Sequence, residues 1–156
     1  MINIIIPGRG SYSIEYIILD LNGTIALDGR IIRGVKERVI TLSEKVQVMV
    51  VTADTNRNAE KLVKNLPVTL LKIEEAQEEE QKCRVVKERG KSSVISIGNG
   101  CNDVCMLRES AIGICVVGRE GASSEAIVAS DLAVHTINDA LDLLLKPHRL
   151  MATLRS

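Results

Sequence analysis

The chain contains almost no aromatic residues: there is no Trp, no Phe and only two Tyr in 156 residues. Single-stranded nucleic acids bind by stacking their bases on aromatic side chains, so this composition excludes a stacking platform of that kind. An excess of charge of one sign is also lacking, because 20 basic and 20 acidic residues give a net charge of zero. A nucleic acid or an acidic membrane would attract a chain with surplus positive charge. We therefore expect neither as a partner.

Long apolar runs are lacking as well, since no stretch approaches the length that crosses a membrane. The apolar residues 2–6 have no basic region before them, and residues 7–10 (Pro-Gly-Arg-Gly) interrupt them, so we expect no signal peptide. No Cys-x-x-Cys pair occurs, and a zinc site is not expected. We expect a cytoplasmic protein whose thiols stay reduced, namely Cys83, Cys101, Cys105 and Cys115.

What the sequence does contain is many aliphatic residues, namely Ile, Val and Leu, which can form a core. The chain length is typical of one domain, and we expect it to span residues 1–156. Short apolar runs alternate with segments of helical spacing. This alternation predicts the α/β class, with a doubly wound, mainly parallel sheet and helices on both faces. We expect strands at residues 2–6, 13–19, 47–51, 68–73, 93–97, 112–117 and 132–135, and helices at residues 34–45, 54–66, 74–89, 102–110, 121–129 and 137–145.

Local signals add detail to this pattern. The link between residues 2–6 and 13–19 is short, so these two strands should run antiparallel. Asp28-Gly29 predicts the turn of a hairpin at residues 27–32. Gly90 predicts the C-cap of the charged helix before it. The acidic run at the start of that helix is interpreted as a solvated face, formed by Glu78, Glu79 and Glu80.

The end of the chain is less determined by its pattern. Thr136 or Asn138 can cap the final helix, and Pro147 should stop it. The apolar segment 141–150 fits a core helix or an interface, which leaves a homo-oligomer open.

Three apolar runs each lead directly into polar residues. Asp20 follows residues 17–19, Thr52 follows residues 48–51, and Gly98 follows residues 94–97. Such runs are typical of buried parallel strands, whose carboxyl ends bind ligands in open α/β sheets. Lys82 and Asp103 are the further charged residues of the pattern. The sequence therefore predicts that a carboxylate, a hydroxyl, a lysine and a further acidic residue meet at one edge, which suits a phosphate and a divalent cation.

Four segments resemble, in order, the motifs of the haloacid dehalogenase superfamily. They are Asp20-Leu21-Asn22-Gly23-Thr24, Val51-Thr52-Ala53-Asp54, Lys82, and Gly98-Asn99-Gly100-Cys101-Asn102-Asp103. Within that superfamily the sequence is most similar to the phosphorylation domain of P-type ATPases, and to a small soluble P-type-ATPase-like group. The resemblance implies a Rossmann-like fold without a cap domain, because only residues 25–33 are available to form a flap.

The resemblance also implies an enzyme, a Mg²⁺-dependent phosphohydrolase that hydrolyses a phosphorylated small molecule or a nucleotide. Asp20 would attack phosphorus and form an aspartyl-phosphate, assisted by Thr52 and Lys82. The phosphate would be bound at Leu21, Asn22, Gly23, Thr24, Ala53 and Asn102. The Mg²⁺ cofactor would be held by Asp20, Asn22, Asn99 and Asp103.

Two residues depart from the superfamily pattern. Asn22 stands where phosphatases carry an Asp that acts as general acid and base, and such a loss costs about 10²–10⁴ in rate. Asn99 stands where a metal-binding Asp is usual, so metal binding should be weak. We expect low activity, a preference for good leaving groups and a slow second step.

Two other classes of protein stay open. A binding or regulatory module with the same fold would also lack these two carboxylates. A receiver of the response-regulator kind has a similar sheet and an acidic site, but its acidic cluster does not come as a Gly-x-Gly-x-Asn-Asp block.

Overall fold

The computed structural model, which describes residues 1–54 and 58–156, is built around one six-stranded sheet. All five pairings within this sheet are parallel, in the order β10-β9-β8-β3-β6-β7. The predicted α/β class and parallel sheet are therefore confirmed. Its strands are β3 (Tyr16–Asp20), β6 (Gln47–Thr52), β7 (Thr69–Lys72), β8 (Val94–Gly98), β9 (Ile112–Val116) and β10 (Leu132–Val134).

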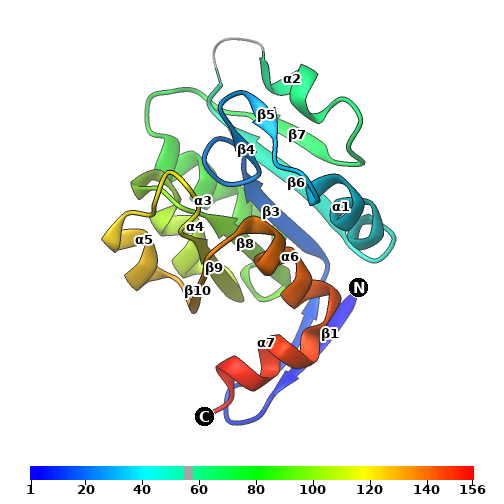
Figure 1. The fold of residues 1–156 in the computed structure, drawn as a ribbon. Helices are drawn as coiled ribbons and strands as arrows, with labels where there is room; N and C mark the ends of the chain where they lie inside the picture. Colours follow the sequence, from blue (N-terminus) through cyan, green and yellow to red (C-terminus); the bar gives the residue numbers. More distant parts are fainter. Residues whose placement is uncertain (55–57) are drawn as a thin grey trace.

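Helices cover both faces of the sheet, as Figure 1 shows. Successive strand residues point to opposite faces, so Ile17 and Leu19 join the core beneath α1 and α6, whereas Ile18 joins the core beneath α3 and α4. Burial on both faces explains why the strands read as unbroken apolar runs. The helices are α1 (Val35–Ser43), α2 (Asn58–Val63), α3 (Glu78–Arg89), α4 (Val104–Glu109), α5 (Ser124–Ala129), α6 (Ile137–Leu145) and α7 (Pro147–Leu154).

The beginning of the chain differs from the prediction. β1 (Ile2–Ile6) and β2 (Gly10–Ile14) form the expected antiparallel pair, but as a separate two-stranded sheet. The single strand predicted at residues 13–19 is wrong, because the chain passes from one sheet to the other at Glu15. There the Glu15 amide donates to Ser93 and its carbonyl accepts from Gln47, so this residue already pairs with the neighbours of β3.

The end of the chain forms one more helix than expected. Pro147 does end α6, yet it also occupies the first turn of α7, where its missing N–H costs nothing. Figure 1 shows α7 beside the β1–β2 hairpin, and the Ser156 amide donates to the Pro7 carbonyl. Leu141 and Leu150 are fully buried, which supports the core alternative for residues 141–150.

Several local predictions are confirmed. β4 (Ala26–Leu27) and β5 (Arg30–Ile31) form the hairpin, with positive φ at Asp28 and Gly29. Residues 21–34, all described, therefore hold a small flap and no larger domain. Gly90 is the C-cap of α3.

Two helix predictions need adjustment. Thr136 caps α6 by accepting from the Asp139 amide, while Asn138 donates to Arg33 instead. The helix predicted at residues 54–66 is shorter, because α2 covers Asn58–Val63; residues 55–57 lie outside the described residues. Among the described helices, none is both long and apolar enough to cross a membrane.

Candidate active site

Three strand ends meet at one edge of the sheet. Asp20 ends β3, Thr52 ends β6, and Asn99 follows β8, with β3 between the other two strands. The chain order reverses direction beside β3, which is where open α/β sheets form a crevice. A cavity of about 380 Å³ opens there, lined by Asp20, Asn22, Thr52, Ala53, Asp54, Glu78, Lys82, Asn99, Gly100, Asn102 and Glu120.

A buried lysine joins two carboxylates at the base of this cavity. Lys82 Nζ lies 2.7 Å from Asp20 Oδ1 and 2.8 Å from Asp103 Oδ1. Lys82 is 1% exposed, Asp103 is 0% exposed and Asp20 is 7% exposed, so Asp20 is the most accessible of the three. The predicted convergence of these three side chains is confirmed.

The second oxygen of Asp103 holds the loop after β8. Asp103 Oδ2 accepts from the backbone amides of Asn99 at 2.9 Å and Gly100 at 3.0 Å. Gly98 makes room for this contact, because a Cβ at that position would lie 2.5 Å from Asp103 Oδ2. Both carboxylate oxygens of Asp103 are thus engaged by the protein, and its role as a metal ligand stays a prediction.

The Thr24 hydroxyl connects the first and fourth motifs. Thr24 Oγ1 lies 3.0 Å from Asp20 Oδ2 and 3.3 Å from Asn99 Oδ1. A single hydroxyl proton serves one acceptor at a time, but both distances place the Asp20 and Asn99 oxygens around one point. Thr24 itself is fully buried. The Thr24 hydroxyl therefore orients Asp20, and the phosphate contact predicted for Thr24 stays a prediction.

Burial changes the acidity of the site. Desolvation, reinforced by the neighbouring Asp103 carboxylate, raises the pKa of Asp20 from 3.8 to about 6, although Lys82 and Thr24 act in the opposite direction. Burial by itself lowers the pKa of Lys82, but its two carboxylate partners outweigh this effect and raise the pKa above 10.5. The lysine therefore stays charged, and two carboxylates with one ammonium leave a net charge of −1 when both acids are ionised.

The predicted phosphate-binding residues differ in their burial and in whether they line the cavity. Asn22 is exposed, and the side chain of Leu21 is fully buried. The amides of Gly23 and Thr24 donate within the loop, to Ala26 and Leu21. Three of the predicted phosphate-binding residues line the cavity, namely Asn22, Ala53 and Asn102. Thr52, which was predicted to assist catalysis, lines it as well.

Two carboxylates at the cavity were missed from the sequence. Glu78 accepts from Asn102 Nδ2 at 2.5 Å, so its interpretation as part of a solvated face is wrong, while Glu79 and Glu80 are exposed as predicted. Glu120 lies in the loop after β9 and lines the same cavity. The only signal for Glu120 was its place after the carboxyl end of a buried strand.

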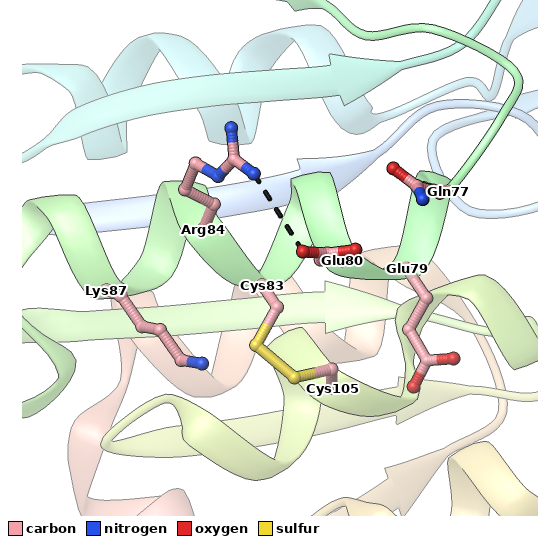
Figure 2. A pocket seen from close by; sticks show the side chains of 7 residues that line it. All are labelled: Gln77, Glu79, Glu80, Cys83, Arg84, Lys87 and Cys105. Carbon is pink, nitrogen blue, oxygen red and sulfur yellow. Dashed lines mark ion pairs between the residues drawn. A yellow bond between two sulfur atoms is a disulfide. The ribbon is translucent and has the colours of Figure 1, made fainter.

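A disulfide joins the two helices behind the site, as Figure 2 shows. Cys83 of α3 is bonded to Cys105 of α4, so the prediction of reduced thiols is wrong for this pair. Their 22-residue separation carries no local signal; the packing of α3 on α4 brings them together. Cys101 and Cys115 are free, as expected. The bond links the helix of Lys82 to the helix that begins beside Asp103.

No family model matches the chain. Solved structures, however, share its fold over nearly its whole length. The cobalt-bound deoxy-D-mannose-octulosonate 8-phosphate phosphatase of Haemophilus influenzae has a TM-score of 0.72 and 14% identity, covering 92% of this chain and 94% of that chain. A phosphatase of the haloalkanoate (HAD) enzyme superfamily from Bacteroides thetaiotaomicron has a TM-score of 0.63 and 12% identity, covering 93% and 97%. The chain therefore has the fold of the haloacid dehalogenase superfamily, as its motifs indicated.

Two relatives from one organism show the family of the chain. The uncharacterized protein MJ0073 of Methanocaldococcus jannaschii is 54% identical over 69 residues, which are 44% of this chain and 74% of that protein. The uncharacterized protein MJ0072 of the same organism is 55% identical over 40 residues, 26% of this chain and 91% of that protein. The chain belongs to the same family as these two proteins.

P-type ATPases match over part of the chain. The phospholipid-transporting ATPase neo1 of Schizosaccharomyces pombe is 39% identical over 62 residues, which are 40% of this chain but only 6% of that protein. A zinc-transporting PIB-type ATPase has a TM-score of 0.64 and 21% identity, covering 78% of this chain and 20% of that chain. The chain thus spans a small part of these transporters, in agreement with the resemblance of its motifs.

Proposed function

We propose that the protein is a Mg²⁺-dependent phosphohydrolase that acts through an aspartyl-phosphate on Asp20. The observation that carries this proposal is the placement of one partly accessible carboxylate above a buried ammonium in a polar cavity. Several proteins of the same fold are phosphatases by name, which supports this reaction class. The substrate would be a phosphorylated small molecule or a nucleotide.

Asp20 suits the role of nucleophile because its two oxygens are held in place. Lys82 binds Oδ1 and Thr24 binds Oδ2, so the carboxylate has one orientation relative to the cavity. Attack on phosphorus would form a bond from an Asp20 oxygen and break the bond to the leaving group. The Lys82 ammonium, held by Asp103, would stabilise negative charge on the transferring phosphoryl group.

The donor atoms at this point fit Mg²⁺. The Asp20 carboxylate and the Asn99 amide oxygen face the same hydroxyl, and both are hard oxygen donors of the kind Mg²⁺ prefers. The described residues contain no cluster of three or more His, Cys, Asp or Glu that could enclose a metal. We infer an ion held by Asp20, Asn99 and the Asn22 carbonyl, with water completing its shell. A bound Mg²⁺ would neutralise charge on the phosphoryl group.

The buried charges favour an enzyme over the alternative of a binding module. Replacing a buried ion pair by apolar residues is often neutral or stabilising, so folding alone gives little reason to keep such a group. Here Lys82, Asp20 and Asp103 are buried with a net negative charge when all are ionised. A fixed, strongly charged nucleophile site is what phosphoryl transfer requires.

Intact-mass measurement of the phosphorylated protein tests the mechanism. We would incubate it with Mg²⁺ and an aryl phosphate, an acyl phosphate or ATP, quench in acid and locate the adduct by peptide mapping. We expect an adduct on Asp20 that Asp20→Asn abolishes. Asp28→Asn is the matched control, because Asp28 is exposed in the flap turn and Asn tolerates its positive φ.

Two results would count against the proposal. Absence of any adduct with all three phosphate donors would contradict the covalent mechanism. Phosphate release that is unchanged in Asp20→Asn would show that the activity comes from a contaminant, and would favour the binding module.

A further inference from the structure

We propose that Glu120 is the general base that activates water when the Asp20 phosphoenzyme is hydrolysed, in place of the carboxylate that Asn22 lacks. This inference rests on the proposed function and adds a catalytic residue to it. An amide cannot take up a proton at neutral pH, so the residue two positions after Asp20 leaves that step without a base.

The Glu120 carboxylate lies against the nucleophile loop. An added Cβ on Gly23 would meet Glu120 Oε2 at 2.2 Å and Asn99 Nδ2 at 2.9 Å, so both side chains cover the face of Gly23. Gly23 directly follows Asn22, and Glu120 and Asn22 line the same cavity. The carboxylate therefore sits beside the position where superfamily phosphatases carry their acid–base group.

Three hydrogen bonds fix the loop that carries Glu120. The Gly118 amide donates to the His135 carbonyl at 2.9 Å. Asn99 Nδ2 donates to the Gly121 carbonyl at 3.2 Å, and the Ser123 amide donates to the Asn99 carbonyl at 2.9 Å. The loop is thus held on both sides of Glu120, and after Glu120 it is attached to the fourth motif through Asn99.

Three of the other acidic groups at the site have different tasks. Asp20 is the nucleophile, Asp103 is buried with both oxygens engaged, and Glu78 accepts from Asn102. Asp54 also lines the cavity, and Glu120 is chosen over it because the Glu120 carboxylate lies against Gly23 of the nucleophile loop. Glu120 lines the cavity and is exposed, so water can reach its carboxylate.

Hydrolysis of the Asp20 phosphoenzyme forms one bond to phosphorus and breaks another. A water oxygen attacks phosphorus and forms a new P–O bond, while its proton passes to the Glu120 carboxylate. The bond between phosphorus and the Asp20 oxygen breaks, and its electron pair stays on Asp20. Inorganic phosphate and the free Asp20 carboxylate result, and Glu120 then releases its proton to solvent.

Single-turnover decay of the Asp20 adduct tests this role. We expect Glu120→Gln to form the adduct at the wild-type rate but to hydrolyse it at least about 100-fold more slowly, so that the adduct accumulates. Glu120→Asp should recover part of the rate. Glu125→Gln is the matched control, because Glu125 is exposed in the first turn of α5 and does not line the cavity.

A double variant separates base catalysis from a structural effect. Asn22→Asp restores a carboxylate at the usual position, so adding it to Glu120→Gln should return adduct decay to at least the wild-type rate. Wild-type decay in Glu120→Gln, or no recovery in the double variant, would overturn the inference and leave the proposed function intact. Failure of the wild-type protein to form an adduct would overturn the proposed function, and the inference with it.

Discussion

At the scale of single residues, the site depends on two carboxylates that share one lysine ammonium. Lys82 binds both Asp20 and Asp103, so neither carboxylate has an ammonium of its own. The fully buried Asp103 accepts three hydrogen bonds, from Lys82 and from the backbone amides of Asn99 and Gly100. Desolvation and the neighbouring Asp103 carboxylate raise the pKa of Asp20, and together they outweigh the opposite effects of Lys82 and Thr24.

The first prediction concerns the titration of Asp20. In metal-free protein, carbon-detected NMR of its carboxyl should show a midpoint near pH 6, and Mg²⁺ should lower it because the ion favours the charged form. The folded state holds this proton more tightly than the unfolded state. The contribution of Asp20 to the free energy of unfolding is therefore greatest below about pH 4 and is lost as the pH rises through 6. A midpoint near pH 4 without metal would contradict the burial argument.

The second prediction concerns Asn99. Its Oδ1 faces the Thr24 hydroxyl beside Asp20, so Asn99→Asp adds a full charge to the proposed metal site. We expect Mg²⁺ to bind about 10-fold tighter or more, measured by calorimetry without substrate. Asn3→Asp is the control, because Asn3 is an exposed β1 residue whose side chain only accepts from Ser13. Equal affinity in both variants would argue against Asn99 as a ligand.

At the scale of elements, the α3–α4 pair supports the site from behind. Lys82 lies in α3 next to Cys83, and Cys105 lies two residues after Asp103 (Figure 2). The disulfide therefore restrains α3, which supplies Lys82, relative to the loop that carries Asp103. Its loop of about 22 residues should contribute about 3 kcal/mol to stability through the entropy of the unfolded chain.

The third prediction follows from this bond. Cys105→Ala should lower the free energy of unfolding by about 3 kcal/mol, measured with denaturant. Cys101→Ala, which removes an exposed free thiol, should change it little. A dithiol reductant should bring the wild-type protein to the stability of Cys105→Ala. Wild-type stability that is insensitive to the reductant would show that the bond does not form in solution.

At the scale of the whole molecule, one apolar core connects the two-stranded β1–β2 sheet to the six-stranded sheet. Ile4 and Ile14 of the hairpin, Leu19 of β3 and Leu150 of α7 belong to the same buried cluster. A shared core favours cooperative unfolding. That the chain is a single domain is still a prediction, and unfolding measurements can test it.

The fourth prediction uses the two tyrosines, which lie in different sheets. Tyr12 is in β2, and Tyr16 is in β3 with the Arg89 guanidinium 5.6 Å above its ring. Fluorescence of Tyr12→Phe and Tyr16→Phe therefore reports the two sheets separately. We expect both variants to unfold in a single transition with coincident midpoints, after correction for their own stability. Unfolding of the β1–β2 sheet before the six-stranded sheet would instead indicate two separately folding units.

The amino-acid sequence by itself determined the class of fold and the members of the site core. Short apolar runs that alternate with helical segments are typical of a parallel sheet covered on both faces, and the carboxyl ends of such strands share one edge. Asp20 and Thr52 were therefore predictable from local pattern, and the motif order added Lys82 and Asp103. Cap residues such as Gly90 were also predictable, because their signals act within a few residues.

The tertiary structure alone decided the contacts between segments that are distant in the chain. Local periodicity says nothing about the pairing of Cys83 with Cys105, the approach of Glu120 to Gly23, or the passage between sheets at Glu15. Each of these follows from how helices and loops pack once the sheet is formed. The same packing decides that Asp20 is buried enough for its pKa to rise, because desolvation depends on surroundings contributed by the whole chain.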